Sequence, residues 1–510
     1  MIPGFERWAP RYGDLHSHCD LSYGHGSREE ALCNARLQLD FVSVTVHGAW
    51  PDVPDDDPEL GYLVDYHRRG FERAREGWDA YARWVEDSYE PGRLVTLPSF
   101  EWHSRRYGDY CAYFRDPEDS RIIDAGDLPE LRDAVHGAPG GAMLIPHHTG
   151  YQHGHRGIDW DAFREASSPL AEIVSFHGAA ESCDGPVPYL HAMGPRVRSG
   201  TARHGWASGH RFGVVGGTDH HNAVPGAYGF GRTGAWLTDL TRESLWEALR
   251  SRRTYALTGD RIALAFAVDG TPMGGVAAAS EGEREIDVAV RGGHGLEYVE
   301  ILHDERVVHR ASLLPRPAFG DGPSRVKVHV EVGWGERREA TAWDVELHVR
   351  DGRLVDVEPR FRGPFPSAAP PFDGSRAPHA LERCGTDGVR FTTRTFPNPH
   401  SAVAATEGVC LEFDADAATE IEAVVNGVRH RIPVRDLSDG ARSAHLGGFV
   451  SPAIAFGRAV PESEFATRFR FRHHARDAGL DAYRVRVRQR NDQWAWSSPV
   501  WMGAATQEGG

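Results

Sequence analysis

The pattern of apolar residues changes near residue 258, and this change limits the possible folds more than any other feature of the sequence. Before it, short apolar runs alternate with helical stretches, such as the run at 41–46 and the amphipathic stretch at 62–89. After it, runs with a period of two residues follow one another, as in RVKVHVEV at 325–332. Alternating strands and helices are typical of a parallel sheet, and successive strands of period two are typical of an all-β unit. The predicted fold class is therefore α/β plus all-β.

Residues 1–258 are predicted to form a barrel domain and residues 259–510 a β-rich, sandwich-like domain. The length of 510 residues agrees with two domains, because a single hydrophobic core stops growing at roughly 250–300 residues. In the first half, strand, crossover and strand recur about seven times, which predicts a parallel sheet closed, or nearly closed, into a barrel. The predicted strands lie at 11–16, 41–46, 93–100, 142–146, 171–176, 211–217 and 234–240. The predicted helices lie at 27–39, opened by a capping box of Ser27 and Glu30, and at 62–89, 128–137, 160–166 and 242–252.

The second half is predicted to consist of strands joined by turns. Turn signals such as Asp351-Gly352 and Asn426-Gly427 separate some of the runs. A Pro/Gly-rich stretch at 363–378 predicts a surface loop.

The charge of the chain limits its partners. The formal net charge of -16 argues against nucleic acid or an anionic membrane, because a phosphate backbone is bound by dense positive charge. No apolar run is long enough to span a bilayer, and the opening MIPGFERWAP has no signal-peptide pattern. Six scattered cysteines without CxxC spacing disfavour a zinc ribbon or a disulfide framework. We therefore expect a cytoplasmic protein that acts on a small molecule; no feature of the sequence indicates an oligomeric state.

The near-absence of lysine excludes further classes of mechanism. Lys327 is the single lysine among the 57 basic residues, and it lies in an alternating strand without a motif around it. A Walker A loop, a Schiff-base enzyme and a two-metal site bridged by a modified lysine each need this amine. All three are disfavoured.

Metal-ligand side chains follow six of the predicted strands in the first half. In a parallel barrel the carboxyl ends of the strands meet on one face, so these residues are expected to share one pocket. Neutral imidazole and carboxylate are ligands that suit Zn, Mn or Fe. The sequence therefore predicts a metal site built from His16 and His18, His47, Glu101 with His103, His147 and His148, His177, and Asp219 with His220 and His221.

The motifs that carry these residues resemble those of the polymerase-and-histidinol-phosphatase (PHP) superfamily. The closer likeness is to its carbaryl-hydrolase-like branch and related uncharacterised bacterial proteins. The resemblance covers most of the chain, and the motifs taken together are specific to this superfamily. The motifs in the first half are GDLHSH (13–18), DFVSVTVH (40–47), FEW (100–102), IPHH (145–148), EIVSFHG (172–178) and GGTDHH (216–221). Those beyond it are RRTYALTGDRI (252–262), GTPMGG (270–275) and AWSSPVWM (495–502).

The resemblance implies a distorted (β/α)7 barrel with two or three divalent ions (Mn, Zn or Fe) at the strand ends. Two positions depart from the family, since Val46 replaces an Asp and Tyr23 stands where an acid or His is expected. His147 is preferred to His148 because it follows its strand directly, as the family ligand does. The implied ligands are His16, His18, Glu101 and Asp219 for the first ion, Glu101, His147 and His177 for the second, and His47, His221 and His25 for the third.

A metal-dependent hydrolase is the predicted function. Two ions bridged by Glu101 would present a hydroxide to an electrophile, and no GxSxG elbow or nucleophilic-cysteine motif competes with it. Arg105, Arg106 and Arg156 are candidates to bind a substrate anion. The leaving group could take its proton from His103, His148 or His220.

Three hypotheses about the activity remain open. The leading one is a phosphoesterase acting on a small phosphate ester. The second, favoured by the carbaryl-hydrolase likeness, is hydrolysis of a carbamate, ester or amide at the same site. The third is a metal-stabilised scaffold whose β-domain binds a carbohydrate or a partner. Trp494, Trp496 and Trp501 fit a binding strip, although core packing accounts for them more simply.

Overall fold

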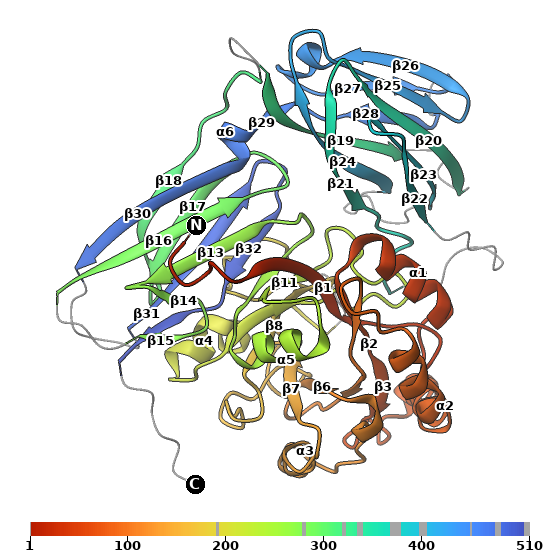
Figure 1. Ribbon diagram of the computed structural model, residues 1–510. Helices are drawn as coiled ribbons and strands as arrows, with labels where there is room; N and C mark the ends of the chain where they lie inside the picture. The colour runs from red at the N-terminus through yellow and green to blue at the C-terminus, as the bar shows by residue number, and fades with distance from the viewer. Residues whose placement is uncertain are drawn as a thin grey trace.

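The chain is a strand-rich mixed α/β structure with few helices, as the computed structural model shows (Figure 1). Among the described residues, no helix is both long and apolar enough to cross a membrane. The structure describes residues 2–189, 193–277, 282–318, 323–333, 340–367, 379–396, 405–448, 451–474 and 481–503.

The first half contains the longer helices, and most of them were predicted. The capping box of Ser27 and Glu30 opens the first helix as expected. The predicted helix at 160–166 is wrong, because these residues form turns; so short a segment gains too few hydrogen bonds to offset helix nucleation. A short helix at 202–207 was not predicted. The helices are α1 (Arg28–Gln38), α2 (Gly61–Asp87), α3 (Leu128–His136), α4 (Ala202–Ala207) and α5 (Arg242–Arg250).

The strands of the first half do not form a uniformly parallel sheet. β1 pairs in parallel with β2, and β3 with β5, but β6 runs antiparallel to both β5 and β7. Only six residues join β5 to β6, too few for the crossover that a parallel pair needs. The strands are β1 (Ala9–Ser17), β2 (Phe41–Val44), β3 (Val46–Ala49), β4 (Val95–Thr96), β5 (Ser99–Trp102), β6 (Asp109–Phe114), β7 (Ala142–His147), β8 (Leu170–Ser175), β9 (Gly178–Ala179), β10 (Gly213–Gly216), β11 (Arg232–Leu237) and β12 (Thr254–Leu257).

The second half is almost entirely β-structure, with α6 (Glu462–Phe465) as its single-turn α-helix among the described residues. Its first strands are β13 (Ala263–Val268), β14 (Thr271–Pro272), β15 (Val276–Ala277), β16 (Glu283–Arg291), β17 (Leu296–His303), β18 (Arg306–Ser312), β19 (Ser324–Gly333), β20 (Thr341–Arg350), β21 (Arg353–Arg360), β22 (Ala380–Cys384) and β23 (Gly388–Thr395). They are followed by β24 (Thr406–Ala415), β25 (Glu420–Val425), β26 (Val428–Pro433), β27 (Arg442–His445), β28 (Ala453–Phe456), β29 (Val460–Pro461), β30 (Ala466–His474), β31 (Ala482–Gln489), β32 (Trp494–Ser497) and β33 (Val500–Met502).

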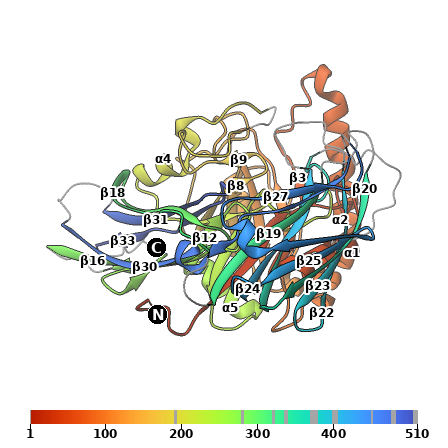
Figure 2. The ribbon, with the colours of Figure 1, turned by 90° about the horizontal axis from the view of Figure 1, so that it is seen from above.

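These strands enclose two separate hydrophobic cores. One lies between a sheet containing β19, β21 and β24 and a sheet containing β20, β23 and β25, with Val328, Leu347 and Phe413 among its buried side chains. The other is lined by β13, β16 and β31 and also takes in Ile2 and Phe5 from the start of the chain. The two units lie side by side in Figures 1 and 2, and Lys327 of β19 donates to the Gly292 carbonyl after β16. The predicted second domain thus holds two cores.

The last strands of the chain return to the sheet of the first half. β32 pairs antiparallel with β12, which joins it to an extended sheet running through β11 and β1 to β4. Trp494, Trp496 and Trp501 lie in these strands and are buried, which agrees with core packing. The domain boundary after residue 258 stays a prediction, and backbone hydrogen bonds cross it.

Lys327 does not face solvent, although the alternation of its strand suggested that it would. Only 9% of the residue is exposed. Its ammonium donates to the carbonyl of Gly292 at 2.7 Å and lies 3.4 Å from Glu412. The amine is therefore held by structural partners in the second half.

A buried ion pair of the second half lies against Tyr228 of the first half. Asp260 accepts hydrogen bonds from Tyr228 at 2.7 Å and from Gln489 at 2.6 Å, and its carboxylate lies 3.0 Å from Arg360. Asp260 and Arg360 are both almost completely buried. Because Arg360 ends β21, this pair fixes where the next residues, 361–367, run.

The 361–367 segment belongs to the stretch predicted as a surface loop, and that prediction is wrong for its first part. Pro364 and Pro366 are buried, and their carbonyls accept hydrogen bonds from residues of the first half. Residues 368–378 lie outside the described residues.

We predict that Asp260→Ala lowers the free energy of unfolding by about 3 kcal/mol, because it removes the nearer of the two carboxylates that face the buried Arg360 charge and leaves the Tyr228 hydroxyl without its acceptor. Urea unfolding followed by circular dichroism measures this. Asp344→Ala is the matched control, since Asp344 pairs with Arg390 on the surface, and such a pair contributes at most about 1 kcal/mol. Equal losses in the two variants would contradict the structural role of the buried pair.

Candidate metal centre

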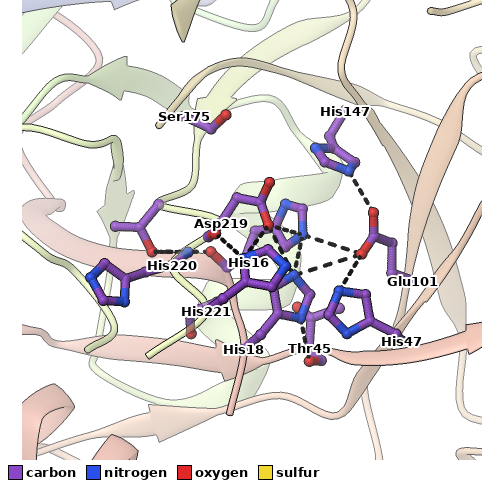
Figure 3. Close-up of polar contacts among 12 residues, drawn as sticks. His16, His18, Thr45, His47, Glu101, His147, Ser175, Asp219, His220 and His221 are labelled. Atoms are coloured by element: carbon purple, nitrogen blue, oxygen red, sulfur yellow. Dashed lines mark hydrogen bonds and ion pairs between the residues drawn. The ribbon is translucent and has the colours of Figure 1, made fainter. Parts of the chain in front are cut away.

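The carboxyl ends of six strands bring the predicted ligands to one place (Figure 3). His16 and His18 come from the end of β1, and His47 from β3. Glu101 lies in β5, His147 in β7, His177 follows β8, and Asp219 with His221 follows β10. All of these except His221 are buried. Residues about two hundred positions apart thus meet, as the sequence predicted.

Five of the imidazoles are anchored at Nδ1 by the surrounding protein. Such outer contacts set the tautomer of the ring and direct Nε2 inward. The anchors are Glu172 for His16 at 3.1 Å, the carbonyl of Thr45 for His18 at 2.9 Å, Ser22 Oγ for His47 at 2.7 Å, the Tyr151 hydroxyl for His177 at 2.8 Å and the carbonyl of Asp219 for His221 at 2.8 Å.

Two pairs of imidazoles face each other through Nε2. The Nε2 atoms of His16 and His18 are 3.1 Å apart, and those of His148 and His177 are 3.0 Å apart. In the first pair both Nδ1 atoms face oxygen acceptors, so each carries a hydrogen, and the two facing Nε2 atoms repel unless a proton or a cation lies near them. Burial lowers the pKa of His16, but Cys111, Glu172 and Asp219 outweigh it and raise that pKa well above its usual range. The positive charge that this approach needs is therefore a proton on His16 or a metal ion.

Glu101 and Asp219 each divide their oxygens between two groups of imidazoles. Glu101 Oε1 lies 2.6 Å from His147, whereas Oε2 lies 3.4 Å from His47. Asp219 Oδ1 lies 3.0 Å from His18, whereas Oδ2 lies 2.8 Å from His177. A carboxylate so arranged can bridge two ions.

Several groups of these side chains can hold a metal ion, because their ligand atoms lie within 4.8 Å of one another. Two members, Glu172 and Asp109, were not among the predicted ligands. Glu172 is a charged residue inside the apolar run of β8, a signal that could have indicated an inward-facing ligand. Asp109 begins β6, a strand that the sequence analysis did not predict. The groups include His18–His47–His221, His16–His18–Glu101, His16–His147–Glu172, His47–Glu101–His103 and Asp109–His147–His148.

The centre has more buried negative charge than its arginine can balance. Glu101, Asp109, Glu172 and Asp219 are all buried here, and Arg156 is the guanidinium that reaches them, through Asp109. Buried carboxylates without compensating charge are costly. Divalent ions or protons on the imidazoles must supply the missing positive charge.

The pKa values show how this charge is shared. Burial alone would raise the pKa of Glu101, but His103 and His147 outweigh it and hold that pKa well below its usual range. Burial lowers the pKa of His221 to about 3 and holds the pKa of His47 well below its usual range. These acids are therefore ionised and these imidazoles neutral, the states in which they bind metal. At His147, burial lowers the pKa, but Glu101 helps to raise it to about 9.

His148, rather than His147, is the neighbour of His177. Its ring lies 4.2 Å from that of His177, compared with 6.4 Å for His147. His147 instead lies against Glu101. Both imidazoles are therefore at the centre, with ring centroids 3.6 Å apart, and the choice of His147 as the ligand that joins His177 stays a prediction.

Three residues of the centre have a left-handed backbone. His148, Arg156 and Asp219 have positive φ angles, of 56°, 66° and 52°. This region is costly for residues with a side chain and persists where the surrounding structure fixes it, often at functional sites. At His148 the rings of two adjacent histidines lie 3.6 Å apart.

The 219–222 loop lies beside the end of β1. The Asp219 N–H donates to the carbonyl of His16 at 2.6 Å, and the His18 N–H donates to the carbonyl of His220 at 2.8 Å. His25, the predicted third-ion ligand, donates its N–H to the carbonyl of His221 at 2.7 Å. The ring of Tyr23 stacks on that of His47 at 3.5 Å. The residues predicted around the third ion are therefore neighbours.

The three predicted substrate arginines occupy different environments. Arg156 lies at the centre, where it contacts His103 at 2.7 Å, pairs with Asp109 and stacks on Trp50 at 4.9 Å. Its side chain is 16% exposed. Arg105 and Arg106 are exposed, and their backbone N–H groups donate to Asp52.

The predicted proton donors also differ. His103 Nδ1 lies 3.1 Å from Asp109, and His103 Nε2 lies 3.3 Å from the Tyr23 hydroxyl. His148 Nδ1 lies 3.2 Å from the same Asp109 carboxylate. His220 is fully buried, and its two ring nitrogens contact the Pro364 carbonyl and the Asn222 N–H. Figure 3 shows its ring on the side away from Glu101.

Comparisons with known proteins find distant relatives. The chain is 26% identical to an uncharacterised protein of Chlamydia pneumoniae over 252 residues, which is 46% of this chain and 40% of that protein. Uncharacterised proteins of Chlamydia trachomatis and Chlamydia muridarum are 28% identical over 169 residues, 30% of this chain and 27% of theirs. The chain thus matches less than half the length of these relatives. No protein-family model matches the chain.

Two solved structures are similar at a low level. One is a two-domain protein of Bacteroides vulgatus containing a predicted PHP-like metal-dependent phosphoesterase; it is 14% identical with a TM-score of 0.32, covering 85% of this chain and 97% of that one. The other is a lesion-specific endonuclease of Pyrococcus furiosus, 13% identical with a TM-score of 0.29, covering 48% of this chain and 56% of that one. TM-scores below 0.5 do not establish a shared fold, so function has to be argued from the centre itself.

We predict that His16→Ala and Glu101→Ala each reduce the divalent metal retained after dialysis, because each removes a donor from the centre. Elemental analysis measures the loss. The wild-type melting temperature should also fall on addition of EDTA, since an ion at a hundred times its Kd stabilises the folded state by about 2.7 kcal/mol. His153→Ala is the control, because His153 is an exposed histidine near the centre. Unchanged metal content in the first two variants would contradict the assignment.

Proposed function

We propose that the protein is a metal-dependent hydrolase of the PHP type, built on a distorted (β/α)7 barrel, and that it acts as a phosphoesterase on a small phosphate ester. The observation that carries the proposal is the buried cluster of imidazoles and carboxylates at six strand ends. The resemblance of the motifs to the PHP superfamily agrees with it. In this proposal the ions are held by the predicted ligands together with Glu172 and Asp109.

The donor set fits divalent ions such as Mn, Zn or Fe. Neutral imidazoles and ionised carboxylates are their usual ligands. The facing Nε2 atoms of His16 and His18, 3.1 Å apart, call for positive charge between them. Ions bound here supply a water molecule of lowered pKa and positive charge against the substrate oxygen.

His103 is the proton donor that we favour. Arg156 lies 2.7 Å from its Nδ1 and can only donate, so the hydrogen of the ring is on Nε2, from which it can be given to a leaving group. Asp109, 3.1 Å from Nδ1, holds the Arg156 guanidinium beside the ring. His148 lies beside the same carboxylate and is the second candidate. His220 is less suited, because both of its nitrogens contact the backbone.

Arg156 is the anion-binding residue that we favour. It is held in place by Asp109 and Trp50, and it is one of the few polar side chains of the centre that reach solvent. A guanidinium fixed at the mouth of a negatively charged centre attracts and orients a phosphate. His221, 19% exposed, marks the other accessible point. So narrow an opening favours a small substrate over nucleic acid.

Hydrolysis of an aryl carbamate or ester is the second candidate. It is favoured by aromatic side chains beside His103, namely Tyr23, Trp50 and Phe71, which form one hydrophobic cluster. Such rings suit an aromatic leaving group without a charge. The scaffold hypothesis loses its binding strip, because the C-terminal tryptophans are buried.

We predict that the protein loaded with Mn or Zn hydrolyses p-nitrophenyl phosphate faster than 1-naphthyl carbamate. Steady-state assays with both substrates measure this. A faster carbamate reaction would favour the second candidate. Activity on neither substrate, nor on a broader ester panel, despite retained metal would favour a scaffold.

We also predict that Arg156→Met lowers kcat/KM for p-nitrophenyl phosphate by about ten- to a hundredfold, the loss expected for one charge-assisted hydrogen bond. The carbamate, which carries no charge, should be affected much less. Arg105→Met is the matched control, because Arg105 is an exposed arginine at the same rim. An equal effect on both substrates would mean that Arg156 acts only through Asp109 and the fold.

A further inference from the structure

The second half contributes backbone to the metal centre through the 361–367 segment. The Pro364 carbonyl lies 3.0 Å from His220 Nε2, and the Pro366 carbonyl accepts the His221 N–H at 2.9 Å. The Asn222 amide donates to the Phe365 carbonyl at 2.8 Å and to the Pro366 carbonyl at 3.1 Å. Three successive carbonyls thus hold the 219–222 loop, which carries Asp219 and His221, on the side away from β1.

The composition of the segment suits this role. Pro364 and Pro366 have no N–H, so the segment offers acceptors to the loop without competing donors at these positions. Phe365, which precedes Pro366, is disfavoured from helical conformations, which favours an extended backbone between the Pro364 and Pro366 carbonyls. Gly363 has a φ of +72°, and a Cβ there would lie 2.6 Å from Val224 Cγ2. The segment therefore has one compatible path past the loop.

Glu407 fixes the start of this path. It lies in β24, it is 2% exposed, and its two oxygens accept the N–H groups of Arg362 at 2.6 Å and Gly363 at 2.8 Å. Arg362 also donates through its guanidinium to the carbonyl of Tyr228 at 2.9 Å. Burial raises the pKa of Glu407 to about 8. Both oxygens face backbone donors, and each keeps a lone pair in the protonated acid as well as in the carboxylate, whereas the amide nitrogen of a glutamine can only donate.

We propose that Glu407 is a positioning residue for the metal centre: through the 361–367 segment it fixes the 219–222 loop and so the placement of Asp219 and His221. The proposal rests on the metal centre proposed above. Glu407 touches neither a ligand nor the substrate. Its effect passes through the 361–367 segment, which contacts the loop that carries the ligands. Loss of such an outer contact lowers metal affinity by about ten- to a hundredfold.

Glu407→Gln tests this by two measurements. The first is hydrogen–deuterium exchange, followed by mass spectrometry in EDTA, of peptides that cover residues 219–223. We expect exchange there to be about tenfold faster than in the wild type, because the acceptor of the His221 N–H is no longer held. The second is calorimetric titration with Mn2+, in which we expect about tenfold weaker binding of at least one ion.

Glu464→Gln is the matched control. Glu464 is also fully buried in the second half and accepts a backbone N–H, from Arg316 at 2.6 Å, but it does not contact the 361–367 segment. We expect it to lose stability without a change at residues 219–223 or in Mn2+ affinity. Gly363→Ala, which displaces the segment by a different route, should reproduce the effect of Glu407→Gln.

The outcomes separate the two proposals. Unchanged exchange and unchanged Mn2+ affinity in Glu407→Gln would overturn the positioning role while leaving the metal centre intact. Equal changes in Glu464→Gln would overturn it as well, because general destabilisation would then explain them. Failure of the wild-type protein to bind Mn2+, Zn2+ or Fe2+ would instead contradict the proposed function, whereas the exchange experiment in EDTA would still report on Glu407.

Discussion

Two buried nitrogen atoms that face each other, Nε2 of His16 and Nε2 of His18, constrain much of this molecule. Nothing in a hydrophobic interior would hold them 3.1 Å apart without positive charge nearby. The fold maintains this arrangement by fixing each ring from behind, with Glu172 for one and the Thr45 carbonyl for the other. Those anchors belong to other strands. Their hydrogen bonds to His16 and His18 therefore help to fix β2, β3 and β8 relative to β1, in addition to apolar packing. A cation completes a site whose protein part is already rigid.

The sequence pattern predicted the parts of the fold that depend on interactions between residues close together in the chain. The capping box of Ser27 and Glu30, the long amphipathic α2 and the buried strands that precede the ligands were all visible, because periodicity and caps act within a few residues. The sequence pattern did not show that the first half contains both parallel and antiparallel strand pairs. This mixture depends on the short β5–β6 connection, and β6 was not recognised as a strand. Asp109 was missed with it, and Glu172 was passed over although it stood inside a predicted strand.

Other features depend on contacts between distant residues. The sequence places His147 and His148 side by side, but it does not show that the ring of His148, rather than that of His147, lies beside His177. A Pro/Gly-rich stretch resembles a solvent loop until the neighbours of Pro364 and Pro366 are known. The alternation around Lys327 likewise indicates a surface, whereas a second sheet and Glu412 cover it. In each case the deciding partner lies far away in the chain.

The pairing of β12 with β32 has a consequence for biosynthesis. During translation β12 emerges with one edge hydrogen-bonded to β11 and the other exposed, because the residues that cover it, such as Trp496 opposite Ala256, are made near the end of the chain. At roughly 5–20 residues per second, the delay is on the order of tens of seconds. An open edge of this kind is a template for association with other chains. The order of synthesis therefore leaves this edge of the first half open until β32 has been made.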